Sequence, residues 1–272
     1  MSTLTKQSLA VVLFLFVGHF AATGVALAQD PGYALRFDGA SDFVRLAETA
    51  FIMAPGWEST KTVSLWVKPT GAAYCNYPSP ASCDVIFGDR PRWWGISRGV
   101  SQGVDRIWVW NVDGDVDAVG IEYALDEWIH VTLVHSDGIL RAYRNGVLVG
   151  SVPSGATQQP STGALPILHL GGMINNVTRN WTFAGDIDEV QIWNAARTPE
   201  QIARDMMEPL LVSEPDLAAY YRMSDGPGSL LLTDDSGHGW TGALTDGGLG
   251  VPPDGPILWV TSGAFNINLP IR

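Results

Sequence analysis

Short runs of β-branched and aromatic residues, separated by turn dipeptides, occupy most of this sequence. Asp-Gly occurs at 38–39, 113–114 and 137–138, and Asn-Gly occurs at 145–146. These dipeptides tolerate positive φ angles and are typical of the tight turns between antiparallel strands. The clearest case is ILRAYRNGVLVGS (139–151), which predicts a β-hairpin. Many short strands at even spacing are typical of a β-sandwich or jelly roll, so we expect an all-β fold.

One short helix is expected near residues 199–207. Thr198 is a favourable N-cap, Pro199 suits the first helical position, and Gln201 completes a capping box with Thr198. Ile202 and Met206 are spaced so that they share one face of this helix. We therefore predict a short helix that packs directly after the last strand of a sheet.

The N-terminal residues have the pattern of a signal peptide. Lys6 precedes the apolar run LAVVLFLFVG, and Ala26-Leu27-Ala28 fits a small-x-small cleavage site. We predict that residues 1–28 are removed on export and that the product is secreted, whether extracellular, periplasmic or at the cell surface. No later stretch reaches the ~18 apolar residues of a spanning helix, so no transmembrane segment is expected. The oligomeric state is left open.

The charge of the chain disfavours anionic partners. The formal net charge is −12 at pH 7. A surface of this sign repels nucleic acid and anionic membranes and attracts cations. We therefore expect no nucleic-acid partner.

The two cysteines, Cys75 and Cys83, flank a loop rich in Pro and Ser. In an oxidising compartment they are expected to form one local disulfide. A zinc site would need further ligands nearby, and the loop offers none.

Four segments of the sequence form an ordered series of motifs. They are ALRFDGASDFVRL (34–46), TVSLWVKPT (62–70), EWIHVTLVHSDGILRAYRNGVLVGS (127–151) and FAGDIDEVQIWNAARTPEQI (183–202). Together they resemble the opening strand pair, second strand, central hairpin and closing strand and helix of bacterial LamG-like (concanavalin A-like) jelly-roll domains. The resemblance covers roughly residues 33–206. It implies a jelly-roll β-sandwich of two antiparallel sheets, with a LamG-like domain at 29–206.

The C-terminal residues 207–272 resemble a displaced part of the same family. LAAYYRMSDGPGSLLLTDDSGHGWTGAL (217–244) is similar to a segment that usually precedes the opening strand. Two interpretations stay open: a permuted strand that completes the sandwich, or the remnant of a second repeat. We favour the first, because the residues after 260 are too few to supply the rest of a repeat.

The acidic strand DIDEVQIW (186–193) raises the question of a metal site. At strand period, one face is predicted to carry Asp186, Asp188, Val190 and Ile192, and the other Ile187, Glu189, Gln191 and Trp193. A carboxylate beside core aliphatics must be paired, hydrogen-bonded or metal-bound. The resemblance implies one structural Ca²⁺, a cation that prefers hard oxygen ligands. Asp188 would be the principal ligand, with Asp38, Asp42 and Asp186.

The alternative is that these acids bind no metal. Asp38 would then be a turn residue, and Asp186 would lie at the end of an exposed strand.

Two catalytic patterns in the sequence are incomplete. Some glycosidases of this fold carry Glu-x-Asp-x-x-Glu on one strand, and DIDEVQ resembles it with Gln191 in the last position. A retaining glycosidase needs two carboxyl groups, and Gln191 removes one of them. GISRG (95–99) has the spacing of a nucleophile elbow, which requires a following helix, but a strand is expected there. We therefore expect no catalytic residues.

The tryptophans suggest a binding role. An exposed Trp can stack on a sugar ring, and Trp93 or Trp94, beside Arg92, is predicted to lie partly exposed in a loop. We predict a secreted, non-catalytic binding module for an extracellular glycan or protein, with a structural calcium ion. The alternatives are a structural or adhesive surface component without a small ligand, and a glycan-cleaving enzyme.

Overall fold

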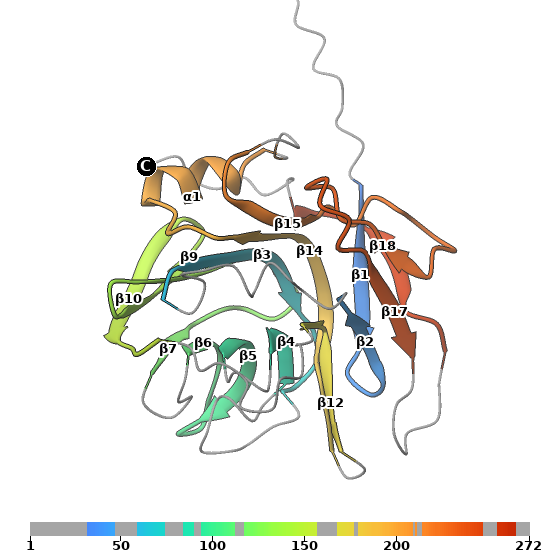
Figure 1. Cartoon of the computed structure of the whole chain (residues 1–272). Coiled ribbons are helices and arrows are strands. Elements are labelled where there is room, and N and C mark those ends of the chain that lie inside the picture. The colour runs from blue at the N-terminus through green and yellow to red at the C-terminus, as the bar shows by residue number, and fades with distance from the viewer. Residues whose placement is uncertain are drawn as a thin grey trace, which may run out of the picture. The chain divides into compact units, whose positions relative to one another are not determined.

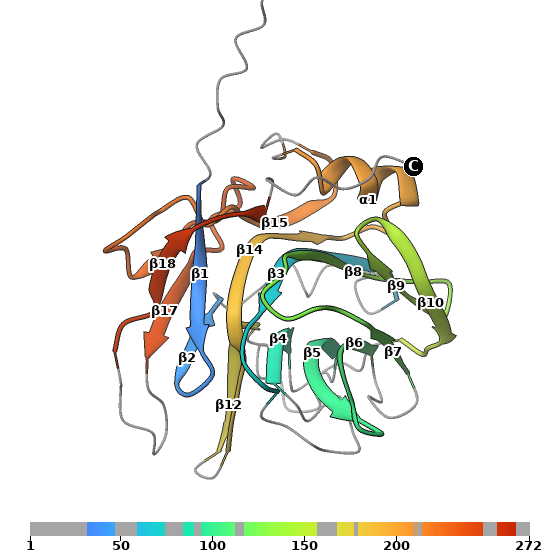
Figure 2. The same ribbon diagram turned by 180° about the vertical axis from the view of Figure 1, so that it is seen from behind.

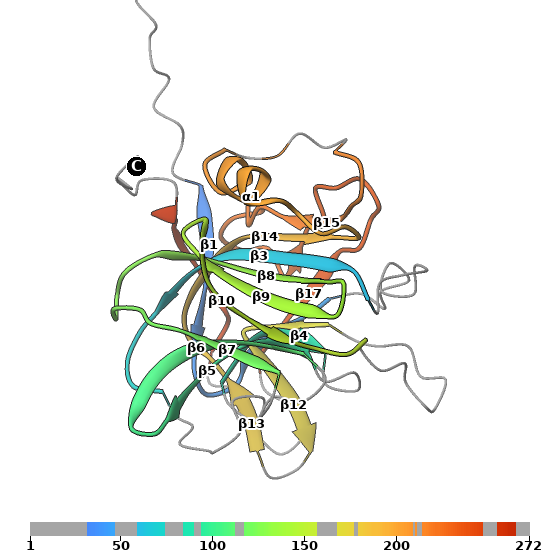
Figure 3. The ribbon, with the colours of Figure 1, turned by 90° about the vertical axis from the view of Figure 1, so that its left-hand side faces the viewer.

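Two antiparallel β-sheets face each other in this protein, as the computed structural model in Figures 1 and 3 shows. The structure describes residues 32–46, 59–73, 84–89, 94–111, 117–156, 168–176, 179–208, 210, 214–246 and 255–264. All of them belong to one compact unit, Pro31–Arg272. The predicted signal peptide, Cys75 and Cys83 lie outside the described residues.

The first sheet has eight strands in the order β10-β9-β8-β3-β14-β1-β18, with β15 also paired to β14. Its strands are β1 (Tyr33–Asp38), β3 (Lys61–Pro69), β8 (Ile129–Ser136), β9 (Ile139–Arg144), β10 (Val147–Pro153), β14 (Ala184–Trp193), β15 (Leu217–Tyr221) and β18 (Leu258–Thr261).

The second sheet also has eight strands, in the order β16-β17-β2-β11-β4-β5-β6-β7. They are β2 (Asp42–Arg45), β4 (Asp84–Asp89), β5 (Trp94–Ser101), β6 (Val104–Asn111), β7 (Ala118–Ile121), β11 (His169–Leu170), β16 (Leu231–Leu232) and β17 (Gly242–Asp246). A separate hairpin joins β12 (Gly172–Asn176) to β13 (Arg179–Thr182).

The hydrophobic core lies between the two large sheets. Alternate residues of the first sheet, such as Leu35 and Val63, are buried together with Ile96 and Val109 of the second. This arrangement confirms the predicted all-β jelly-roll sandwich and follows from the period-2 pattern of the strands.

Local signals in the sequence correctly located the hairpin and the helix. Asn145 and Gly146 join β9 to β10 with φ angles of 48° and 76°, the positive values that this tight turn requires. Helix α1 (Pro199–Asp205) has Thr198 as its N-cap and the capping box with Gln201. Among the described residues, no helix has the length and apolar character that a membrane span requires.

The C-terminal strands lie in the same sheets as the N-terminal ones. β15 pairs with β14, β17 with β2, and β18 with β1. Figures 1 and 2 show β17 and β18 beside β2 and β1, although the two pairs come from opposite ends of the chain.

The predicted alternation of β14 is wrong beyond Asp188. Asp188 pairs with Trp66 of β3 and Gln191 with Ser64, so β14 has one residue more than its partner between these pairs. The extra residue forms a β-bulge at Glu189, whose φ is 52°. Ile187 and Val190 therefore both lie in the core, and the acids Asp186 and Asp188 do not share a face with the core aliphatics.

Candidate functional site

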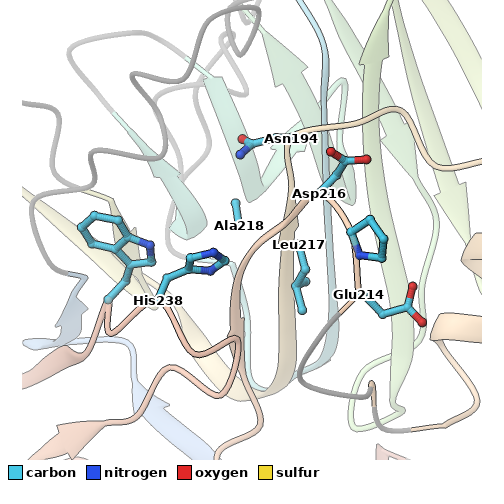
Figure 4. A pocket seen from close by; sticks show the side chains of 8 residues that line it. Asn194, Glu214, Asp216, Leu217, Ala218 and His238 are labelled. Atoms are coloured by element: carbon cyan, nitrogen blue, oxygen red, sulfur yellow. The ribbon is translucent and has the colours of Figure 1, made fainter.

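An open pocket of 530 Å³ lies where three segments of the chain meet beside β15. Its lining consists of Asn194, Glu214, Pro215, Asp216, Leu217, Ala218, His238 and Trp240. Figure 4 shows Asn194, Asp216 and His238 around the side chain of Ala218. Asn194 directly follows β14, Asp216 directly precedes β15, and His238 comes from the loop between β16 and β17.

Asp234 holds the loop that contributes His238 and Trp240. Its buried carboxylate accepts hydrogen bonds from the backbone N–H groups of Tyr220, Ser236 and Trp240, each at 3.0 Å. The N–H of Asp235 in turn donates to the carbonyl of Tyr220 at 2.7 Å. The loop thereby satisfies backbone groups on the edge of β15 that faces away from β14, which fixes one wall of the pocket.

The opposite wall is a turn that presents polar groups. The N–H of Asn194 donates to the carbonyl of Asp216 at 2.9 Å, and Asp216 has a φ of 64°. Asp and Asn tolerate this conformation better than most residues. Asn194 Oδ1 is buried and accepts no hydrogen bond from the described residues.

The pocket combines an aromatic surface with few, converging polar groups. Trp240 supplies the aromatic side chain, while Asn194, Asp216, Glu214 and His238 supply hydrogen-bonding groups. His238 is exposed, and its Nδ1 lies 3.0 Å from the Ser236 hydroxyl. Pockets of this size and composition are suited to small polar molecules with one apolar face.

A pair of buried carboxyl groups lies at the bulge of β14, away from the pocket lining. Ser262 Oγ donates to Asp188, the N–H of Glu189 donates to Asp188 at 2.8 Å, and the Tyr220 hydroxyl donates to Glu189. Burial, with the charge of Glu189 second, raises the pKa of Asp188 well above its ordinary value. Burial raises the pKa of Glu189 to about 7, against the hydrogen bond from Tyr220 and the charge of Arg222.

The four predicted calcium ligands do not converge on one point. Asp38 and Asp42 lie together in the β1–β2 turn, where the N–H of Asp38 donates to Asp42 at 3.1 Å. Asp186 instead forms ion pairs with Arg36 at 2.7 Å and with Lys68 at 2.6 Å. Asp188 lies two residues farther along β14 and accepts a hydrogen bond from the Ser262 hydroxyl. These four residues do not fit a single shared Ca²⁺, and the described residues contain no group of three or more His, Cys, Asp or Glu placed to hold a metal.

The predicted aromatic binding residues are not a surface pair. Trp94 has an exposed fraction of 0% and packs in the core against Phe87, with ring centroids 5.6 Å apart. The prediction that Trp94 could lie in an exposed loop is therefore wrong, because β5 begins at this residue and turns it inward. Trp93 and Arg92 lie outside the described residues.

The strand that resembles a glycosidase motif is occupied by structural contacts. The buried amide of Gln191 accepts from Ser64 at 3.2 Å and donates to the carbonyl of Asp205 at 3.1 Å. Ser97 of the GISRG segment is buried within β5, with no following helix. Neither pattern presents a reactive group to solvent.

Sequence reasoning did not single out the residues of the pocket. Asn194, Asp216 and Trp240 are far apart in the chain, and no motif connects them. The signal available was the segment DDSGHGW (234–240), whose Asp, Ser and Gly residues are typical of turns. Its Asp234 is the residue that places His238 and Trp240 beside β15.

Comparison with known families identifies the class of protein. The model of the concanavalin A-like lectin/glucanases superfamily, Laminin_G_3, matches residues 38–203, which is more than half of the chain. The chain therefore belongs to this superfamily. No curated protein matches the sequence.

Solved structures that align with parts of this chain come from several organisms. A candidate carbohydrate-binding protein from Bacteroides ovatus aligns with a TM-score of 0.60 and 16% identity, over 85% of this chain and 60% of that one. This chain thus spans less than two thirds of that protein. A heptameric SAP-like pentraxin from Limulus polyphemus aligns with a TM-score of 0.44 and 18% identity, over 64% of this chain and 81% of that one. Domain 4 of an extracellular arabinanase from Geobacillus stearothermophilus, in complex with arabinotriose, aligns with a TM-score of 0.40 and 24% identity. The alignment covers 63% of this chain and 75% of that one.

Proposed function

We propose that this protein is a secreted, non-catalytic module that binds an extracellular glycan in the pocket beside β15. The observation that carries the proposal is the combination of Trp240 with the polar side chains of Asn194, Asp216 and His238 around one open pocket. A sugar ring offers an apolar face for an aromatic side chain and hydroxyl groups for such polar side chains. The likeness to a candidate carbohydrate-binding protein supports the same class of ligand.

The proposal is non-catalytic because the strand that resembles a glycosidase motif lacks free acids. Glycosidases of the common kinds need one carboxylic acid and one carboxylate on either side of the scissile bond. Here Asp186 is compensated by Arg36 and Lys68, and the last acid of the motif is replaced by the buried Gln191. A glycan-cleaving enzyme therefore has less support than a binding module.

A glycan array followed by titration calorimetry tests the proposal. We expect at least one glycan to bind, and Asn194→Ala or His238→Ala to weaken it by about fivefold, the effect of one hydrogen bond. Leu148→Lys, on the distant strand β10, serves as the control and should leave the affinity unchanged. Glycan binding that neither pocket variant weakens would contradict the assignment of the pocket.

A structural or adhesive role is the second candidate, and strand β10 favours it. Val147, Leu148 and Val149 have exposed fractions of 67%, 51% and 45% on the last strand of the first sheet. An exposed apolar edge strand can pair with a strand of another protein. If no glycan binds and Leu148→Lys abolishes self-association or adhesion to a surface protein, this candidate replaces the first.

The calcium ion implied by the family resemblance stays a proposal for the β1–β2 turn alone. Asp38 and Asp42 are the two predicted ligands that lie together. A ligand that binds only the folded state raises the unfolding temperature with concentration. We expect calcium to raise it and Asp42→Asn to remove the increase, and an unchanged unfolding temperature would contradict the proposal.

A further inference from the structure

The charge of the pocket points to a narrower class of ligand than glycans in general. We infer that the pocket recognises a glycan that carries ammonium groups, that is, one built from amino sugars. This inference rests on the proposed function, because it names the chemistry that the same pocket would select.

The first observation is that hydrogen-bond acceptors predominate in the pocket. The carboxylates of Glu214 and Asp216 are acceptors, and none of the eight lining residues is Lys or Arg. An ammonium group has three donors and no acceptor, so it complements such a site. A neutral hydroxyl supplies only one donor and brings no charge.

The second observation is that Asp216 carries a negative charge without a compensating partner. Its carboxylate is exposed and forms no hydrogen bond or ion pair with the described residues. The bond from Asn194 N–H engages its backbone carbonyl only, at 2.9 Å. The turn therefore fixes the main chain of Asp216 and leaves its carboxylate available to a ligand.

The neighbouring charges compensate one another and do not cancel that of Asp216. Asp205 pairs with Arg197 at 2.5 Å and with Arg204 at 2.8 Å, while Arg204 lies 3.7 Å from Glu214. These two cations and two anions form a balanced group. Asp216 is the excess charge at the pocket, and a cationic ligand gains from it.

The aromatic residue of the pocket agrees with the same ligand. Trp is the side chain that attracts a cation most strongly through its ring face. A glycan bearing carboxylate or sulfate groups would instead meet the uncompensated carboxylate of Asp216. Repulsion of anionic glycans and attraction of cationic glycans would both contribute to the specificity of the pocket.

Two oligosaccharides of equal length, one with free amino groups and one with N-acetylated amino groups, test the inference. Glucosamine and N-acetylglucosamine oligomers are titrated into the protein at a pH that keeps the amine protonated. We expect the glucosamine oligomer to bind about tenfold more tightly, as for a hydrogen bond to a charged group. The preference should fall when salt is raised from about 0.05 M to about 0.5 M, because exposed charges are screened.

Asp216→Asn assigns that preference to the pocket. The variant keeps the tolerance of positive φ and removes only the charge, so the two oligomers should bind it equally. Asp126→Asn is the matched control, because Asp126 is also an exposed turn residue, with a φ of 62°. It should retain the full preference.

The outcomes separate this inference from the proposed function. Equal affinity of the two oligomers for the unmodified protein overturns the inference and leaves glycan binding intact. A preference that Asp216→Asn retains also overturns it, because the charge would act elsewhere. If the array finds no glycan of any charge, the proposed function fails and the inference fails with it.

Discussion

Two acidic sites on β14, only two residues apart, are stabilised in opposite ways. Asp186 is 1% exposed and forms ion pairs with Arg36 and Lys68 of the adjoining strands. Asp188 and Glu189 are equally buried but receive hydrogen bonds from the hydroxyls of Ser262 and Tyr220. Hydroxyls stabilise a carboxylate less than a full positive charge does. Burial raises the pKa values of Asp188 and Glu189, and the hydrogen bonds from these hydroxyls offset only part of that effect.

The difference follows from where the neighbouring strands end. Up to Ile187, the edge of β14 opposite β3 pairs with β1, which brings Arg36 beside Asp186. From Val190 onward the same edge pairs with β15, which brings Tyr220. The bulge at Glu189 lies at this change of partner, and Asp188 directly precedes it. Asp186 and Asp188 are the same residue type on the same strand. Their different partners therefore follow from which strand lies beside each of them.

The largest effect is expected from disturbing the backbone of the bulge. Glu189→Pro would fix φ at about −65° in place of 52° and remove the N–H that donates to Asp188, so we expect a loss of about 3 kcal/mol or more. Glu189→Gly is the matched control, because it also removes the carboxyl group but keeps the N–H, and glycine readily adopts this φ. Urea unfolding should show the proline variant to be far less stable than the glycine variant. Equal stability of the two would contradict the role of the bulge.

An intermediate effect is expected for the charge of Glu189. Its folded pKa of about 7 lies above the ordinary 4.5, so the folded state binds the proton more tightly than the unfolded state. The contribution of Glu189 to stability is therefore fully present below pH 4.5 and is lost as the pH rises from 4.5 to 7, by about 1 to 3 kcal/mol. Asp188, Asp235, Arg222 and Tyr220 are the charged or titratable groups that act on this site.

Glu189→Gln should flatten this pH dependence and stabilise the protein above pH 7, because the amide oxygen can still accept from Tyr220. Unfolding free energies measured across the pH range check the prediction. Glu122→Gln, at a side chain that is 78% exposed, should leave the profile unchanged. A variant with the steep profile of the unmodified protein would show that another group titrates.

The smallest effect is expected at Asp186. Asp186→Asn removes the charge that Arg36 and Lys68 share, but their side chains are 46% and 21% exposed and can be hydrated by water. We expect a loss of about 1 kcal/mol that decreases at high salt. Unfolding at low and high ionic strength measures it, with Asp126→Asn as an exposed control. A salt-independent loss above about 3 kcal/mol would mean that the pair behaves as fully buried.

Local patterns were sufficient for most of the fold. The β-branched runs, the Asn145-Gly146 turn and the capping box at Thr198 each depend on residues within one turn or strand, and each was predicted correctly. Trp94 was misplaced for the same reason: the residues around it resemble a loop, and its burial depends on Phe87 of the neighbouring strand. A contact between two strands cannot be predicted from the residues next to Trp94 in the sequence.

The sequence by itself determined the sandwich, because alternating apolar residues and turn dipeptides act over a few residues and need no knowledge of partners. Tertiary structure alone decided the sites. It broke the alternation of β14 where β1 gives way to β15, and it gave Asp186 two cations while its neighbours received hydroxyls. It also brought Asn194, Asp216 and His238 to one pocket. These outcomes depend on which distant strands become neighbours, and that is settled only when the sheets assemble.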